Sequence, residues 1–349
     1  GITVWNRIHE IMPNGMGLFG DPSTSQSALI IPAPGRPYIY YVFNPAPVTS
    51  SSVGSRCLCL YYSIIDMRAD AGFGDVVKKN ELVLNDITEH LTATADCSGD
   101  GVWIVVRSRT TRHFYSLHLI RDQLTTLPVV SDGGNPTLIV RDAGQMHISP
   151  DSRQLVITSA TGNSQLYDFD AQTGKVTNGI NLFKTEVFGS HYGAAFSSDS
   201  KKLYISVANE GPITPTRIYQ FSIGVKDATA VTDSKYIVGE LPGTYNWTPM
   251  QLAPDGRIYI GRSGQPWLAM IESPNADSSL AALRDTAVRL TGVCRFGLPN
   301  LIGSSLIDPS LRLTACSLPR ASFAFPADIC EETCISIRDE STGSIDSWQ

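Results

Sequence analysis

Short stretches of apolar residues, separated by polar turns, recur along the chain and predict antiparallel β-strands. The clearest run is Met146–Val176, with strands expected at Met146–Ser149, Gln154–Ser159 and Gln165–Phe169. The connections between them are rich in Ser, Asp, Gly and Asn, which supply turn geometry and local side-chain to backbone hydrogen bonds. Such a meander has an apolar face that it cannot bury alone, so further copies are expected.

Copies of the strand–turn–strand pattern occur at Ala93–Val106, Ala194–Val207 and Met250–Ser263. The turn aspartates of the four copies are Asp100, Asp151, Asp199 and Asp255. A spacing of roughly fifty residues is typical of propeller repeats with loop insertions. Each copy is followed by a further strand, which favours four-stranded blades over an array of separate sandwiches, whose period would be about twice as long.

The repeats predict an all-β protein containing a β-propeller of four-stranded blades over residues 1–317. Five units are visible, the first being Ser25–Leu84 with an insertion at Pro45–Arg56 and a polar connection over Gly72–Leu84. The ends Gly1–Phe19 and Val293–Ser305 could combine into a sixth blade or complete a seventh. Six or seven blades are therefore expected, and a blade built from both ends would leave no open sheet edge.

Composition narrows the possible partners. The chain is 42% hydrophobic and only 17% charged, with a formal net charge of −6. That charge, without any Lys/Arg run, argues against nucleic acid, and no apolar run reaches the ~20 residues of a membrane span. Abundant Ser, Thr, Gly and Asn with few charges suit a secreted or cell-surface β protein.

The seven cysteines cannot all pair within the chain because their number is odd. Cys57 and Cys59 lie on the same face of one expected strand, which disfavours a bond between them. Buried thiols are the expected state, and the pair to test for a disulfide is Cys330 with Cys334 or Cys316. The chain has no Cys-x-x-Cys motif, so a structural zinc site has little support.

Several segments resemble a known family. They are QSALIIPAPG from Gln26, YYVFNPA from Tyr40, LYYSIIDMRADAGFGDVVKKN from Leu60, TEHLTA from Thr88 and FGLPNLIGSS from Phe296. Together they are similar to the N-terminal propeller of large secreted, PKD-domain-containing surface proteins of gliding-type bacteria. The resemblance covers about Leu18–Ser305, and Phe296–Ser305 is similar to the family's closing strand.

The resemblance implies that PKD modules follow the propeller and that a C-terminal sorting domain directs type IX secretion. The tail from Ala321 to Gln349 looks like the opening of such a PKD domain, with its A-x-F strand and a tryptophan at Trp348. Residues 318–349 are therefore expected to be the N-terminal fragment of a PKD-like β-sandwich. Neighbouring PKD-like modules of the same chain would then be partners of the propeller.

The usual catalytic and metal motifs are missing, so no catalytic residue, metal or cofactor is predicted. His113 and His118 fall on strands of one blade and are expected to be structural. His147 lies on an expected inner strand, where alternation points it either into blade packing or into the central channel. Asp168 and Asp170 share a strand face and could form a weak calcium site, with an ordinary hairpin as the alternative.

Polar and aromatic residues lie just before the expected inner strands. In a propeller these positions gather on one face around the channel mouth. The predicted ligand-binding residues are Gln145, His147, His191, Tyr192, Tyr245 and Trp247. Their rings could stack on a sugar or grip a peptide, although aromatics of this kind also pack between blades.

Three functional hypotheses follow. A non-catalytic secreted or cell-surface binding or adhesion module, with a glycan or protein ligand, is favoured because no catalytic constellation is recognisable. A propeller hydrolase or lyase at the channel mouth would need two converging carboxylates there, or a metal. A purely architectural module is the third. Propellers carry out all of these roles, so the fold alone does not decide among them.

Overall fold

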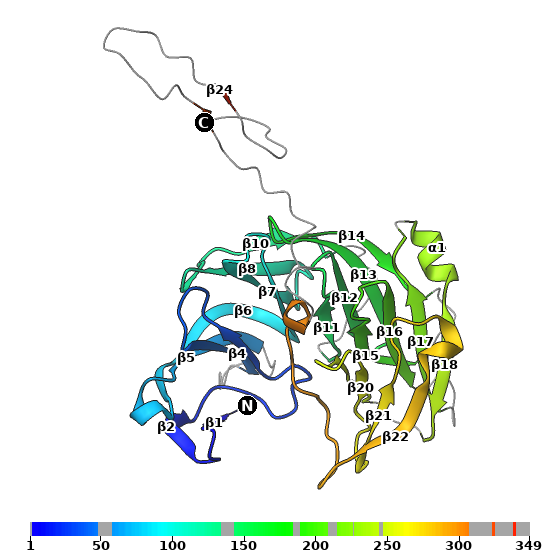
Figure 1. Ribbon diagram of the computed structural model, residues 1–349, viewed down its shortest axis with the longest axis horizontal. Helices are drawn as coiled ribbons and strands as arrows, with labels where there is room; N and C mark the ends of the chain where they lie inside the picture. Colours follow the sequence, from blue (N-terminus) through cyan, green and yellow to red (C-terminus); the bar gives the residue numbers. More distant parts are fainter. Residues whose placement is uncertain are drawn as a thin grey trace.

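The computed structural model of the protein is built almost entirely of β-strands (Figure 1). The residues it describes are 2–47, 58–133, 143–183, 189–208, 215–225, 227–243, 247–306, 323–324 and 338–339. Its helical segments are α1 (Ala228–Asp233), η1 (Asp70–Gly72), η2 (Ser278–Ala281) and η3 (Gly303–Leu306). Over these ranges, none of the helices has the length and apolar character that crossing a membrane requires.

Residues 146–181 form a four-stranded antiparallel sheet, which is called the third unit below. Its strands are β11 (Met146–Ile148), β12 (Gln154–Ser159), β13 (Asn163–Asp170) and β14 (Lys175–Asn181), paired in that order. At the β11–β12 turn, Ser149 Oγ donates to Asp151 Oδ1 at 2.6 Å and accepts from the backbone N of Gln154 at 2.9 Å. This local bonding explains why a Ser-Pro-Asp turn follows the inner strand, and the three strands predicted here are confirmed.

Two later units, the fourth and the fifth, repeat this sheet. The fourth contains β15 (Ser190–Phe196), β16 (Lys202–Ala208), β17 (Thr216–Ser222) and β18 (Tyr236–Leu241), and the fifth contains β19 (Met250–Leu252), β20 (Ile258–Ile260), β21 (Trp267–Ile271) and β22 (Leu283–Arg289). The turn chemistry recurs in the first of them, where Ser197 Oγ donates to Asp199 Oδ1 at 2.7 Å. The predicted repeats at Ala194–Val207 and Met250–Ser263 are thus confirmed as strand pairs.

The first two units are joined by one long strand. Their strands are β3 (Leu29–Pro32), β4 (Ile39–Pro47), β5 (Leu58–Asp66), β6 (Asp75–Ala95), β7 (Gly101–Ser108), β8 (Phe114–Ile120), β9 (Gln123–Leu124) and β10 (Val129–Ser131). Within β6, Ile87 pairs with Leu58 on one side and Ser108 on the other. The first part of β6 is the outer strand of the first unit, and the second part is the inner strand of the second unit.

The polar connection predicted over Gly72–Leu84 is wrong for most of its length. From Asp75 onward these residues pair with β5, although the register shifts several times. Lysine and asparagine side chains are tolerated there because this part of β6 lies at the outside of its unit and much of it is exposed. Polar composition alone therefore did not distinguish an outer strand from a loop.

The turn aspartate of the second unit also differs from the prediction. The backbone N of Asp96 donates to Gly101 O at 2.9 Å, just as Ser149 N donates to Gln154 O at 2.8 Å. Asp96 Oδ1 accepts from Gly99 N at 2.8 Å and from Ser98 Oγ at 2.8 Å. Asp96 therefore closes this turn, whereas Asp100 is exposed beside it.

The units follow one another around a common centre and give the molecule a propeller-like arrangement (Figure 1). The inner strands β6, β11, β15 and β19 contact each other in that order. Apolar side chains pack between neighbouring sheets; Trp103 and Phe114 of the second unit, for example, lie in one cluster with Tyr167 of the third. Trp103 Nε1 also donates to Ala171 O at 2.8 Å, which fixes that pair of units.

The two end segments do not share a sheet. The hairpin of β1 (Thr3–Trp5) and β2 (Ile11–Met16) packs on the first unit, where Met12 meets Val42 and Val76. Residues 296–306 instead lead into the centre, where η3 contacts β6 and β11 (Figure 1). The described parts of Gly1–Phe19 and Val293–Ser305 therefore form no joint blade.

Two short strands, β23 (Phe323–Ala324) and β24 (Arg338–Asp339), pair with each other. The rest of the PKD-like segment predicted over residues 318–349 lies outside the described residues.

Candidate functional site

The predicted rim residue Gln145 joins three units. Its Oε1 atom accepts hydrogen bonds from Ala194 N at 3.1 Å and from Met250 N at 2.8 Å. Gln145 precedes β11, while its two donors belong to β15 and β19. The side chain is buried and works as an acceptor for two inner strands, which satisfies backbone groups that a sheet partner does not reach.

Gln26, which the sequence analysis did not single out, performs the same task one position earlier in the ring. Its Oε1 accepts from Met146 N at 2.9 Å and Leu91 N at 3.2 Å, and its Nε2 donates to Met146 O at 3.0 Å. The only signal in the sequence is a glutamine placed shortly before an inner strand, as at Gln145. That signal is too common to be specific.

Hydroxyl groups on the second strand of two units bridge to the next unit. Thr158 Oγ1 donates to Tyr192 O at 2.6 Å, and Ser206 Oγ donates to Thr248 O at 2.9 Å. Each hydroxyl also accepts from its own inner strand, since Gln145 N and Gly193 N donate to them at 2.9 and 2.8 Å. These bonds connect the inner strands of the third, fourth and fifth units to one another.

The chain's own residues Phe296–Ser305, called the axial segment below, run through this centre. Asn300 Nδ2 donates to Leu91 O at 2.8 Å, and Gln26 Nε2 donates to Asn300 Oδ1 at 3.3 Å. Further along, Leu301 N donates to Gln251 Oε1 at 3.4 Å, and Ala95 N donates to Ser304 Oγ at 3.1 Å. The axial segment therefore connects the first, second and fifth units from inside.

The axial segment is not the closing strand that the sequence resemblance implies. It pairs with no sheet and ends in the 3-10 helix η3. Pro299 lacks a backbone N–H, and Gly297 and Gly303 weaken an extended strand, which is why an apolar run of this composition forms an irregular segment.

Tyr192, Trp247 and Phe296 form an aromatic cluster at one end of the axial segment, here called the rim face. The Tyr192 ring meets Trp247 edge-on at 5.0 Å, and Trp247 meets Phe296 edge-on at 6.1 Å. Tyr192 is buried, and its hydroxyl donates to Phe296 O at 2.7 Å; burial raises the pKa of this phenol. Trp247 is half-buried and Phe296 is 38% exposed, so these two rings carry the accessible surface.

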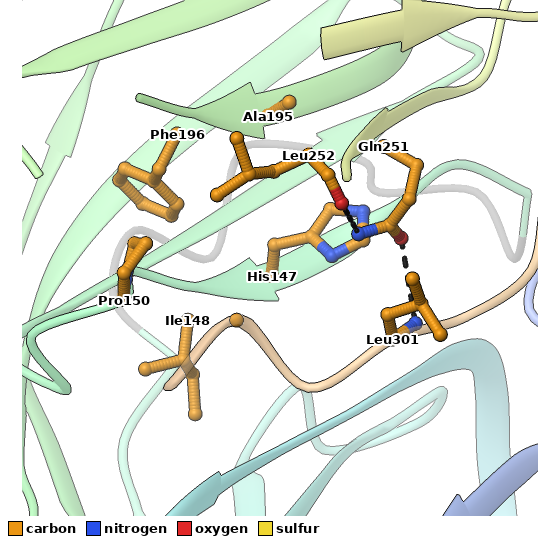
Figure 2. A pocket seen from close by; sticks show the side chains of 9 residues that line it. His147, Ile148, Pro150, Ala195, Phe196, Gln251, Leu252 and Leu301 are labelled. Carbon is orange, nitrogen blue, oxygen red and sulfur yellow. Dashed lines mark hydrogen bonds between the residues drawn. The ribbon is translucent and has the colours of Figure 1, made fainter. Parts of the chain in front are cut away.

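His147 lines a small cavity of about 20 Å³ toward the other end of the inner strands, where Leu301 and Gly303 of the axial segment form part of its wall (Figure 2). Figure 2 shows the His147 ring among the side chains that line the cavity, including Gln251, whose Nε2 donates to Leu252 O at 2.8 Å. The Nε2 atom of His147 is buried without a hydrogen-bond partner, and burial lowers its pKa to about 4. A cavity of this size holds one or two water molecules. Of the two orientations left open by the sequence, the structure has the one that faces the centre.

His191 lies away from the rim. Its side chain is fully buried, with Nδ1 at 2.9 Å from Ser164 Oγ and the ring edge-on to Phe183 at 4.4 Å. A ligand could reach it only if the third and fourth units separated. The sixth predicted ligand residue, Tyr245, lies outside the described residues.

The other residues considered for catalysis or metal binding, His118 and Asp170, form structural hydrogen bonds. His118 Nε2 lies 2.9 Å from Asp96 Oδ2, and the imidazole stacks on Trp103. In the suggested calcium hairpin, Asp170 accepts from Gln172 N at 2.9 Å and Thr173 Oγ1 at 2.6 Å, as in an ordinary Asx turn. Across the part of the chain that the structure describes, no group of three His, Cys, Asp or Glu residues could hold a metal ion.

The described cysteines are in different states. Cys97 is disulfide-bonded, so the expectation of a buried thiol is wrong there. Cys59 keeps its thiol, which lies 3.0 Å from Asn85 Oδ1, and Cys294 is a buried thiol. The predicted pair of Cys330 with Cys334 or Cys316 lies outside the described residues.

No protein-family model matches the chain, and no curated protein matches it. Among solved structures, it is similar to a candidate 6-phosphogluconolactonase from Bacteroides uniformis, with 12% identity over 76% of this chain and 86% of that one, at a TM-score of 0.45. A second candidate 6-phosphogluconolactonase, from Bacteroides fragilis, has 11% identity over 83% and 89% of the two chains, also at 0.45. Hydrazine synthase of Kuenenia stuttgartiensis matches at 13% identity over 71% and 74%, with a TM-score of 0.39.

Proposed function

We propose that this chain is a non-catalytic binding or adhesion module of a larger secreted surface protein, and that its ligand is a glycan or a protein. The observation that carries the proposal is the position of the axial segment. The side chains that surround the centre already form hydrogen bonds within the chain. Examples are Gln26, Gln145 and Tyr192. A ligand would therefore contact the outer surface of the rim face rather than a channel.

Trp247 and Phe296 are the residues proposed to make that contact. Both rings are partly exposed, and their planes are 78° apart. Flat aromatic surfaces of this kind stack on the apolar face of a sugar or grip a peptide side chain. Their orientation is fixed from below by Tyr192, so little conformational freedom would be lost on binding.

The ring is proposed to consist of the five four-stranded units, with the axial segment taking over the role of a further blade. Support comes from the hydrogen bonds that this segment makes to the first, second and fifth units. The surface location, the PKD-like modules after the propeller and type IX secretion remain proposals that rest on the sequence resemblance.

A glycan array probed with the intact chain tests the proposed function. Binding should be lost in Trp247→Ala and weakened in Phe296→Ala. The matched control is Trp267→Ala, because Trp267 is also half-buried but lies in the outer part of the fifth unit. If no glycan on the array binds, the proposed glycan ligand is wrong. If Trp267→Ala reduces binding as much as Trp247→Ala does, the rim face is not the binding site.

A further inference from the structure

Two arginines of the second unit each have a buried nitrogen without a hydrogen-bond partner. Arg107 lies near the end of β7 and is only 1% exposed, and Arg112 lies in the following turn. Nη1 of both side chains is buried and unpartnered within the described structure. Arginine remains protonated in proteins, so both groups carry a full positive charge.

Among the described residues, no carboxylate forms an ion pair with Arg107. Its Nε donates to Arg112 O at 3.2 Å, and its guanidinium lies 5.3 Å from the centre of the Phe114 ring. Burial lowers the pKa of Arg107, and the positive charge of Arg112 lowers it further. An isolated buried charge is costly, and two like charges next to each other are more so. A negatively charged group would relieve both.

A cavity of about 420 Å³ lies beside this cluster, between the second and third units. Its walls include Ser131 and Asp132 from one unit and Tyr167, Lys175 and Asn178 from the other. Tyr167 connects the cavity to the arginines, because its ring meets Phe114 edge-on at 4.9 Å and its hydroxyl donates to Gly133 O at 2.7 Å. Gly133 in turn packs against the backbone carbonyl of Arg112, where a Cβ atom would come within 1.8 Å.

We propose that Arg107 and Arg112 bind a small oxyanion (sulfate, phosphate or a carboxylate) at the interface of the second and third units. Guanidinium groups match such anions because their N–H donors lie in one plane and form short, charge-assisted hydrogen bonds. The proposed route to the arginines leads from the cavity past Tyr167, which lines the cavity, whereas Arg107 and Arg112 do not. Lys175 favours an anion on this path, whereas the carboxylate of Asp132 opposes a polyanion, so the site suits a single small group.

Thermal unfolding of the intact chain with sodium sulfate, phosphate or acetate, each compared with sodium chloride at equal ionic strength, tests the site. We expect a saturable rise in Tm with at least one of the three anions, and the preferred anion identifies the class of ligand. Arg107→Met and Arg112→Met should abolish the rise. Arg68→Met should retain it, because Arg68 is an exposed arginine that pairs with Asp66 at 2.7 Å.

Calorimetric titration of the preferred anion into the wild-type chain and Arg112→Met provides a second readout, in case Arg107→Met does not fold. Heat of binding in the wild type that is absent from Arg112→Met supports the site. The proposal is overturned if no anion exceeds chloride, or if Arg112→Met responds as the wild type does.

Discussion

The side-chain amide of Gln26 pairs with both backbone polar groups of Met146, 120 residues away along the chain. Its Oε1 accepts from Met146 N at 2.9 Å, and its Nε2 donates to Met146 O at 3.0 Å. The glutamine thereby replaces one residue of a neighbouring β-strand. Since the same Oε1 also accepts from Leu91 N, a single side chain joins the first three units.

Replacing this amide should therefore weaken the ring. Gln26→Leu keeps most of the side-chain volume but leaves the buried N–H and C=O of Met146 without partners, which we expect to lower the free energy of unfolding by about 3 kcal/mol. Urea denaturation measures the change. Gln123→Leu, at an exposed position in β9, should change stability by less than about 0.5 kcal/mol. Equal effects of the two substitutions would contradict the bridging role of Gln26.

The hydroxyl bridges of Thr158 and Ser206 should each contribute separately. Thr158→Val and Ser206→Ala each remove one buried donor that reaches the next unit, and each should cost about 1–2 kcal/mol in unfolding free energy. Because the bridges lie at different interfaces, the double variant should cost about the sum of the two. Thr158→Ser keeps the hydroxyl and serves as the control. An undiminished stability in Thr158→Val would show that the bridge is dispensable.

Two buried histidines make stability depend on pH. Burial lowers the pKa of His90 from 6.5 to about 3 and that of His147 from 6.5 to about 4. Between these values and 6.5 the unfolded chain binds more protons than the folded protein. The free energy of unfolding should therefore fall as the pH drops from 6.5 toward 4, and these two groups should have no effect above 6.5.

Urea denaturation of His147→Gln across this pH range checks the prediction. The variant should lose stability less steeply than the wild type, because only His90 then resists protonation. His9→Gln, which removes an exposed histidine, is the matched control substitution. Parallel curves for the wild type and His147→Gln would contradict the assignment.

Much of the fold was predictable because its signals are local. The turn at Ser149–Asp151 is built from neighbouring side chains, so the strands on either side could be placed from sequence. The long strand β6 was not recognised, because its outer part carries the polar residues of an exposed sheet edge. Alternation also fails at β15, where the register shifts between His191 and Ala194 and both His191 and Tyr192 become buried.

The positions of several residues around the centre were predicted from the sequence, but the segment that they contact was not. Gln145, Tyr192 and Trp247 do gather at one end of the inner strands, as expected for positions that precede them. What they meet is the axial segment, 104 residues beyond Tyr192 at Phe296. Contacts over such separations leave no periodic signal in the sequence, and an apolar segment with Gly and Pro reads equally well as a poor strand.

Removing a single oxygen atom, the hydroxyl of Tyr192, should weaken the attachment of the axial segment. Tyr192→Phe removes the hydroxyl that donates to Phe296 O while keeping the ring contact with Trp247, and it should cost about 1 kcal/mol. Limited proteolysis should then cleave near Arg295 faster than in the wild type. Tyr115→Phe, whose hydroxyl makes only an exposed 3.5 Å contact with Thr111, is the matched control. Equal cleavage rates in the wild type and both variants would count against this anchor.

Hydrogen exchange of the peptide covering residues 300–305, followed by mass spectrometry, tests most directly whether the chain occupies its own centre. Within this peptide the backbone amides of Leu301 and Ser305 donate to Gln251 Oε1 and Ile302 O, so these two amides should be protected to a degree close to that of the inner strand β15. Exchange as fast as in the exposed turn around Leu127, which is 83% exposed, would mean that the segment does not reside there and that the centre is open to a ligand.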